Sequence, residues 1–254
     1  MTDTLSIEQL LARLERAATT GAMAIACDAD GTLWRGDIGE TLFLAALERG
    51  LFREAARETL AADAAACGAR ASGDANELAR ALFDAYYDGR YDEQRAFGMM
   101  AWAFAGWSES ELTSFSARVL DDFGFDEAVR EQTRALLAWA ARHDHRVWVV
   151  SASPELIVFE AARRLGLPRA RVVAMRVAED DGVLLPALGC PATYAAGKLA
   201  RLREHTHDAL LAALGDSIYD LALLKDALVP VAVDPKPSLR AALDELAGAV
   251  VLRV

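Results

Sequence analysis

The most constraining feature of this sequence is the segment AMAIACDADGTLW at residues 22–34. It opens with a short apolar run, which is typical of a buried strand. Asp28 follows where that strand should end, and Asp30 comes two residues later. Because side chains of an extended chain alternate between two sides, both carboxylates would point the same way. Open α/β sheets bind ligands at the carboxyl ends of their strands, so a functional site is predicted there.

The chemistry of this segment has two interpretations. Two neighbouring carboxylates suit either a hard cation or a proton-transfer task. Gly31 permits a backbone conformation that lets the chain leave the sheet at once. The alternative is a solvated turn, since Asp and Gly are ordinary turn residues.

A long helical insert is predicted after this first strand. Between Ile38 and about Arg142 the apolar residues recur at helical spacing, without a convincing strand pattern. One strand-helix-strand crossover takes ~30 residues, whereas the next apolar strand, residues 146–150, lies more than a hundred residues further on. We therefore expect a helical insert over 37–126 within a core formed by 1–36 and 127–254. A separate tandem domain is the alternative, although one strand alone cannot form a sheet.

The rest of the chain alternates between strands and helices. Helices are predicted at 4–20 (with Ser6 as N-cap and Gly21 as its end), 127–143, 154–165, 198–205, 218–226 and 237–246. Strands are predicted at 146–150, 171–177, 209–214, 228–233 and 249–254, with a hairpin strand at 183–188. This alternation favours an α/β fold, namely a Rossmann-like core with a parallel sheet between two helical layers.

Composition excludes several classes of partner. The formal net charge of −11 argues against a nucleic-acid groove, which needs clustered Lys and Arg. The three cysteines, Cys27, Cys67 and Cys190, form no C-x-x-C pair, so neither a disulfide framework nor a zinc site is indicated. The N-terminus lacks the pattern of a signal peptide, and no apolar run reaches the ~18 residues of a membrane span. We expect a cytoplasmic monomer or homodimer without nucleic-acid or membrane partners.

A second polar segment follows the strand at 146–150. In Ser151-Ala152-Ser153-Pro154, Ser153 is predicted to cap a helix with Pro154 at its first position. The free N–H groups of such a helix start suit phosphate, and Ser151 could add a hydroxyl. Plain capping is the alternative.

Two further segments place charged residues next to predicted helix starts. Lys198 lies at the start of a helix, where the helix dipole disfavours a cation. A nearby phosphate or carboxylate would explain it, although surface lysines are common. Asp216 follows the strand at 209–214, and Asp220 can turn back to the same strand end if a helix begins near Ser217. An ordinary helix start is the alternative for that segment.

Together and in this order, these motifs resemble the haloacid dehalogenase-like superfamily of phosphohydrolases. The match consists of Asp28-x-Asp30-Gly-Thr, Ser151, Lys198 and Gly215-Asp216-x-x-x-Asp220, which spans nearly the whole core. The insert is similar to the superfamily's small α-helical cap. The SASP and TYAAGK segments are most similar to the phosphoserine-phosphatase-like branch.

The resemblance implies catalysis by the first motif. Asp28 would be the nucleophile that forms an aspartyl-phosphate. Asp30 would protonate the leaving oxygen and then deprotonate the attacking water. Carboxylate attack on a phosphate brings two anions together, so a cation such as Mg²⁺ is required. An acid at the second position separates the superfamily's phosphatases from its dehalogenases.

The resemblance also implies a set of binding residues. Phosphate or substrate would be bound by Ser151, Ala152, Lys198, Gly31 and Asp37. Mg²⁺ would be bound by Asp28, the carbonyl of Asp30 and Asp216, with Asp220 in the outer shell.

The expected substrate is a small phosphorylated metabolite. In phosphoserine phosphatases an acid at the place of Asp37 contacts the amino group, although here Asp37 could simply cap a helix. Tyr219 stands where an Asn is usual, and glycines do not follow Ser151, which weakens the case for phosphoserine. Aromatic residues of the insert are expected mainly in its core, but aromatic faces also suit alkylammonium groups, as in phosphocholine. The alternatives are a phosphotransferase or mutase of the same fold, or a non-catalytic module that binds a phosphorylated ligand.

Overall fold

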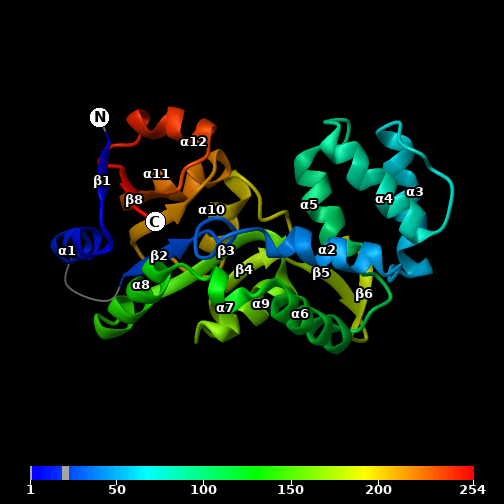
Figure 1. Ribbon diagram of the computed structural model, residues 1–254, viewed down its shortest axis with the longest axis horizontal. Coiled ribbons are helices and arrows are strands. Elements are labelled where there is room, and N and C mark those ends of the chain that lie inside the picture. Colours follow the sequence, from blue (N-terminus) through cyan, green and yellow to red (C-terminus); the bar gives the residue numbers. More distant parts are fainter. Residues whose placement is uncertain (1, 19–22) are drawn as a thin grey trace.

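The computed structural model describes residues 2–18 and 23–254, and its centre is a seven-stranded parallel sheet (Figure 1). The strand order is β1-β9-β8-β7-β2-β3-β4. The strands are β1 (Asp3–Leu5), β2 (Ala24–Cys27), β3 (Arg146–Pro154), β4 (Val172–Met175), β7 (Leu210–Gly215), β8 (Ala227–Val233) and β9 (Val250–Leu252).

Different helices cover the two faces of the sheet. Ile25 and Cys27 of β2 pack into one cluster, and Ala24 and Ala26 pack into another. The first cluster includes residues of α1 (Ile7–Ala17), α8 (Glu131–Arg142) and α9 (Glu155–Arg164). The second includes residues of α10 (Ala196–Arg203), α11 (Leu221–Lys225) and α12 (Pro237–Ala242). Burial on both faces explains the unbroken apolar run of β2. The predicted Rossmann-like, three-layer α/β fold is confirmed.

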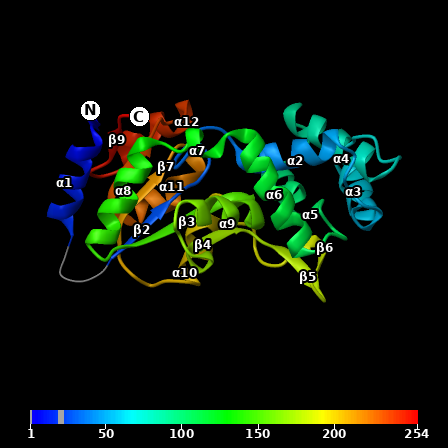
Figure 2. The ribbon, with the colours of Figure 1, turned by 60° about the horizontal axis from the view of Figure 1, so that its bottom comes forward.

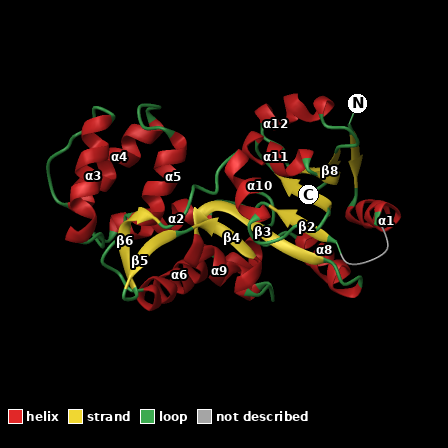
Figure 3. Ribbon diagram, turned by 180° about the vertical axis from the view of Figure 1, so that it is seen from behind, coloured by secondary structure: helices red, strands yellow, loops and turns green. Residues whose placement is uncertain are grey.

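The chain between β2 and β3 is helical, as predicted. Before α8, its helices are α2 (Ile38–Glu48), α3 (Glu54–Ala66), α4 (Ala75–Tyr87), α5 (Glu93–Trp102), α6 (Glu109–Phe123) and α7 (Phe125–Ala128). Asp74 and Ser108 begin α4 and α6 with capping boxes, which satisfy N–H groups at those helix starts. In Figure 1, α3, α4 and α5 form a group at the right, to one side of the sheet, and the view from behind in Figure 3 shows the same group at the left.

The predicted hairpin is present and lies beside this helical segment. β5 (Val177–Asp180) and β6 (Val183–Leu188) form a separate antiparallel sheet, which Figure 2 shows next to α5 and α6. Leu184 joins the hairpin to the loop before α6, because its N–H donates to the Trp107 carbonyl at 2.8 Å. Its own carbonyl accepts from the N–H of Gly106, also at 2.8 Å.

Several predicted boundaries were wrong. Residues 3–5 form an edge strand, because they pair with Val250–Leu252 of β9, and the helix begins only after its predicted N-cap, Ser6. That helix ends at Ala17, where Ala18 turns to an extended conformation; Gly21 and Ala22 lie outside the described residues. The helix predicted at 127–143 divides into α7 and α8, and the strand predicted at 171–177 divides into β4 and β5.

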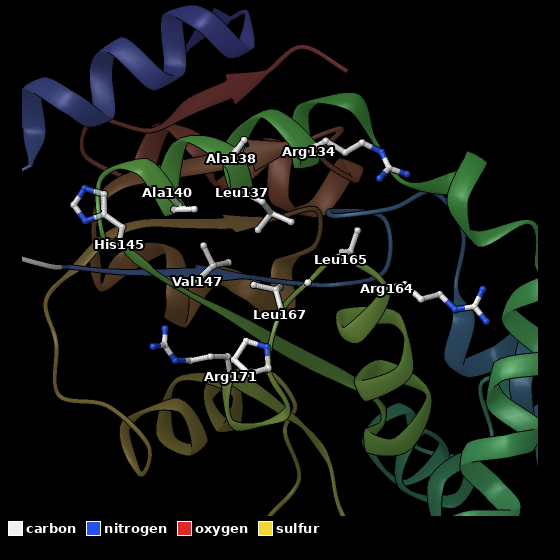
Figure 4. Close-up of a pocket in the computed structure, with 13 residues that line it drawn as sticks. Arg134, Leu137, Ala138, Ala140, His145, Val147, Arg164, Leu165, Leu167 and Arg171 are labelled. Atoms are coloured by element: carbon white, nitrogen blue, oxygen red, sulfur yellow. The ribbon is translucent and has the colours of Figure 1, made fainter.

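One groove lies away from the strand ends considered below. It has a volume of about 500 Å³ and opens between α8 and the loop that follows α9 (Figure 4). Its apolar floor includes Leu137, Val147 and Leu167. Val147 lies at the beginning of β3, so this groove is at the opposite edge of the sheet from the carboxyl end of that strand.

Over the residues described, no helix combines the length and apolar character needed to cross a bilayer.

Candidate active site

The carboxyl ends of β2, β3 and β7 meet at one cavity of about 80 Å³. The predicted site residues that line it are Asp28, Asp30, Asp37, Ser151, Ala152, Lys198 and Asp216. Two more predicted residues lie directly behind this lining: Asp220 contacts Lys198, and Gly31 lies against Asp216. Seven lining residues were not predicted for the site, namely Glu93, Phe97, Ser153, Tyr194, Ser217, Tyr219 and Lys236.

Asp28 occupies the first position after β2 and is buried. Its N–H donates to the carbonyl of Leu214, which anchors it to β7 at 2.9 Å. One carboxylate oxygen accepts from Lys198 Nζ at 2.6 Å, and the other accepts from Thr32 Oγ1 at 3.3 Å. Burial and the neighbouring charge of Asp220 raise the pKa of Asp28, and Lys198 opposes that shift.

Lys198 joins the carboxylates of Asp28 and Asp220, at 2.6 Å from each. Burial alone lowers the pKa of this lysine, but the attraction of the two carboxylates outweighs burial and raises it. These ion pairs explain a cation near the start of α10, where the helix dipole disfavours one. Asp220 is held in turn by the N–H of Asp216 at 3.2 Å and the N–H of Ser217 at 3.0 Å.

The side chain of Asp30 accepts three hydrogen bonds. Oδ1 accepts from Trp34 Nε1 and from the N–H of Ile38, both at 2.8 Å. Oδ2 accepts from Ser153 Oγ at 2.6 Å. Donors from three segments fix both oxygens, so the carboxyl group keeps one orientation at the cavity wall.

The predicted helix cap at Ser153 was wrong. β3 continues through Pro154, and α9 begins at Glu155 without a side-chain cap. The hydroxyl of Ser153 is engaged with Asp30, so it is unavailable to a helix N-terminus. The Ser153 N–H donates to Ser151 Oγ at 3.0 Å, which orients the hydroxyl of Ser151.

Asp216 lies just after β7, and in space its side chain lies between Gly31 and Lys236. A Cβ atom at Gly31 would lie 2.2 Å from Asp216 Oδ2, and the positive φ of Gly31 (76°) also favours glycine, which explains this residue in the first motif. Lys236 Nζ lies 3.0 Å from the same oxygen. Burial raises the pKa of Asp216, and Lys236 works in the opposite direction.

The acidic cluster fits a divalent cation. Asp28, Asp216 and Asp220 are buried, and each offers a carboxylate oxygen within 4.8 Å of the others. Two ammonium groups, on Lys198 and Lys236, face these three carboxylates, so negative charge remains in excess. Carboxylate oxygens are the ligands that Mg²⁺ prefers, so the cluster supplies a suitable donor set for that ion.

The opposite side of the cavity is aromatic and acidic. The ring centroids of Tyr194 and Tyr219 are 4.6 Å apart, and Phe97 of α5 lies 5.9 Å from Tyr194. Tyr219 Oη donates to Glu93 of α5 at 2.5 Å, so a hydrogen bond joins the helical insert to the loop after β7. Glu93 and Phe97 lie on a helix and not at the end of a strand, so the strand-end pattern that located other site residues could not identify them in the sequence.

Asp37 both caps α2 and lines the cavity. It accepts from the N–H of Glu40 at 2.8 Å, which is the capping arrangement foreseen for it. Burial, followed by repulsion from Asp30, raises the pKa of Asp37 to about 7. Its carboxyl group therefore changes charge near neutral pH.

The chain matches the sequence model of the haloacid dehalogenase-like hydrolases over residues 25–225. A search of curated proteins found no match.

Solved structures resemble the whole fold at low sequence identity. A protein of unknown function from Bordetella pertussis has a TM-score of 0.71 and 20% identity, over 92% of this chain and 99% of that one. A substrate-bound phosphoserine phosphatase has a TM-score of 0.51 and 16% identity, over 90% of this chain and 100% of that one. A phosphoserine phosphohydrolase-like protein from Francisella tularensis has a TM-score of 0.55 and 14% identity, over 90% and 94%.

Proposed function

The chain belongs to the haloacid dehalogenase-like hydrolases, and on that basis we propose that it is a Mg²⁺-dependent phosphomonoesterase for a small phosphorylated metabolite. The observation that carries this proposal is the cavity where Asp28, Asp30, Lys198 and Asp216 meet. A carboxylate nucleophile, a second acid and a buried cation are the groups that phosphoryl transfer through an aspartyl-phosphate needs.

The reaction proceeds in two steps. A carboxylate oxygen of Asp28 attacks phosphorus, the bond to the leaving alcohol oxygen breaks, and Asp30 gives that oxygen a proton. A water molecule then loses a proton to Asp30 and attacks the phosphorus of the aspartyl-phosphate, which releases phosphate and restores Asp28. A divalent cation held by Asp28, Asp216 and the Asp30 carbonyl would offset the repulsion between carboxylate and phosphate.

Phosphate binding is assigned to Ser151, Ala152, Lys198 and the Gly31 backbone. Lys198 is buried and already faces carboxylates, so its charge needs no further desolvation when substrate enters. Asp220 is a positioning residue, because it holds the ammonium of Lys198 at the cavity wall.

The residues that line the cavity favour a substrate with a positive charge at the end away from its phosphate. Asp37 and Glu93 supply negative charge, and Phe97 and Tyr194 supply aromatic surface, which together suit an ammonium group. Within the described chain no arginine lines the cavity, Lys198 is assigned to the phosphate and Lys236 faces Asp216, so a substrate carboxylate has no evident partner. These features support an amino-alcohol phosphate such as phosphocholine over phosphoserine.

Access requires movement, because a cavity of about 80 Å³ holds only a few water molecules. We infer that residues 37–126 act as a cap over the core formed by 1–36 and 127–254. The cap opens to admit the substrate and closes to exclude bulk water. A cytoplasmic location and a monomeric or dimeric state stay predictions.

The test is phosphate release from a panel of phosphate monoesters. It comprises p-nitrophenyl phosphate, phosphocholine, phosphoethanolamine and phosphoserine, each assayed with Mg²⁺ and with excess chelator. We expect Mg²⁺-dependent release, fastest with the amino-alcohol esters. Adding an alcohol acceptor separates hydrolysis from phosphotransfer, because a transferase yields the acceptor's phosphate ester. If no ester releases phosphate in the presence of Mg²⁺, the protein is not a phosphatase for these esters, and a non-catalytic module that binds a phosphorylated ligand is the interpretation left.

A further inference from the structure

The chain uses lysine very sparingly. Of its 27 Lys and Arg residues only three are lysines, namely Lys198, Lys225 and Lys236. Two of these three, Lys198 and Lys236, line the same cavity. Lysine carries a compact point charge on a flexible stem, whereas arginine carries a broad planar group. This distribution places two of the chain's three lysine ammonium groups at one cavity.

Lys236 is fixed to Asp216 by its backbone as well as by its side chain. Its N–H donates to the carbonyl of Asp216 at 2.8 Å, and its Nζ lies 3.0 Å from Asp216 Oδ2. It sits between Pro235 and Pro237, just after β8, so its loop has few conformations open to it. The Lys236 side chain is 63% exposed, so its ammonium is accessible to solvent while it faces Asp216.

Lys236 also reaches solvent on a second side. It lines an open depression of about 550 Å³ together with Asp216, Arg130 and Asp234. Asp216 therefore lies between the inner cavity and this depression. Asp234 already lies 3.7 Å from Arg130, and Arg35 lines the same depression, so an ammonium that leaves Asp216 moves into open solvent and not to a free carboxylate.

We propose that Lys236 is a tethered counter-ion, which holds the Asp216 carboxylate while no divalent cation is bound and competes with that cation for it. The proposal rests on the proposed function only in that Asp216 is a metal ligand. A positive charge 3.0 Å from a ligand oxygen lowers the affinity of that oxygen for a second cation. Lys236 is thus a positioning residue that sets the Mg²⁺ concentration at which the site fills.

The experiment measures Mg²⁺ binding without substrate, by isothermal titration calorimetry of the full chain after chelator treatment. Lys236→Gln removes the charge from an exposed side chain and creates no buried cavity. We expect it to bind Mg²⁺ about threefold to fivefold more tightly, the scale of a partly exposed ion pair. Lys236→Arg keeps a positive charge and should stay close to wild type. Lys225→Gln, at an exposed position at the end of α11, is the matched control and should change nothing.

The sign of the effect separates this role from a structural one. If Lys236 only supported the loop or the orientation of Asp216, its loss would weaken Mg²⁺ binding. Equal or weaker binding by Lys236→Gln overturns the proposal, and so does tighter binding by Lys225→Gln. Because no substrate is present, the result is independent of whether any phosphate monoester is hydrolysed. A protein that releases no phosphate but shows the tighter binding would therefore refute only the proposed function.

Discussion

The ammonium of Lys198 lies 2.6 Å from a carboxylate oxygen of Asp28, and both groups are buried. The two residues are 170 positions apart in the sequence, on α10 and just after β2. Asp220 contacts the same ammonium from a third element. A buried charge is tolerated only where opposite charge and hydrogen bonds compensate it, so this contact matters to the fold as well as to the chemistry.

Lys198→Met is therefore expected to destabilise the protein. The substitution leaves Asp28 and Asp220 without their shared cation, and breaking a buried ion pair in this way costs about 3–5 kcal/mol. The free energy of unfolding from urea titration at neutral pH, without divalent cations, measures the loss. Lys225→Met, at an exposed position, is the control. A loss of less than about 1 kcal/mol, the scale of a surface pair, would contradict this account.

Asp30→Asn is expected to affect substrates according to their leaving groups. An alkyl phosphate needs a proton on the departing oxygen, whereas p-nitrophenolate is a good leaving group without one. We predict a loss of kcat of about 10²–10⁴-fold for alkyl phosphates, the usual contribution of a general acid. The loss for formation of the aryl product should be distinctly smaller in a single-turnover measurement. Equal losses for both substrates would exclude Asp30 as the acid.

Asp37 should give substrate affinity a pH dependence. Its pKa of about 7 means that the carboxylate form is lost as pH falls through neutrality. An ammonium-bearing ester should then show a KM that rises below pH 7, whereas the KM of p-nitrophenyl phosphate should change much less. Asp37→Asn keeps a good N-cap for α2 and should remove that difference between the two esters. A wild-type KM ratio that is flat between pH 6 and 8 would argue against contact with the ammonium.

The same shift predicts how stability changes with pH. The carboxyl of Asp37 has a pKa of about 7 in the folded protein and an ordinary one of about 4 when unfolded. Between these values the folded state holds more protons, so stability falls as pH rises from about 4 to about 7 and then levels. Comparing the wild type with Asp37→Asn by urea unfolding across this window isolates the contribution. If the wild type instead gains stability relative to Asp37→Asn as pH rises, the pKa of Asp37 is not raised by folding.

Ala195 offers a test of backbone strain beside the site. This residue precedes α10 with φ 48° and ψ −122°, a region that favours glycine. Ala195→Gly should raise the free energy of unfolding by ~1 kcal/mol, since relief of strain exceeds the entropic cost of glycine. Ala200→Gly, at an exposed position inside α10, should lower it by a similar amount. If Ala195→Gly is no more stable than wild type, the strained conformation costs little.

Much of the site was predictable because it follows the ends of parallel strands. Asp28, Ser151 and Asp216 come directly after apolar runs that are buried on both faces, and such runs are readable in a sequence. The parallel arrangement then brings those ends to one edge of the sheet. Lys198 was found because a cation at a helix start conflicts with the helix dipole.

The missed features depend on contacts between distant segments. Ser153 has the sequence pattern of a helix cap, but its hydroxyl donates to Asp30, and only the packed structure shows that competition. Glu93 belongs to a helical insert, and no local sequence pattern encodes its contact with Tyr219 after β7. Lys236 could have been found, since it follows β8 and is one of only three lysines in the chain.

The central claim is that Asp28 is the nucleophile, and acid-quenched intact-mass spectrometry tests it most directly. Wild-type protein mixed with p-nitrophenyl phosphate and Mg²⁺ should show a species heavier by one phosphoryl group, and peptide mapping should place that group on Asp28. Asp28→Asn should remain folded, form no such species and release no phosphate. A variant that retains phosphate release, or a phosphoryl group found on another residue, would contradict the account.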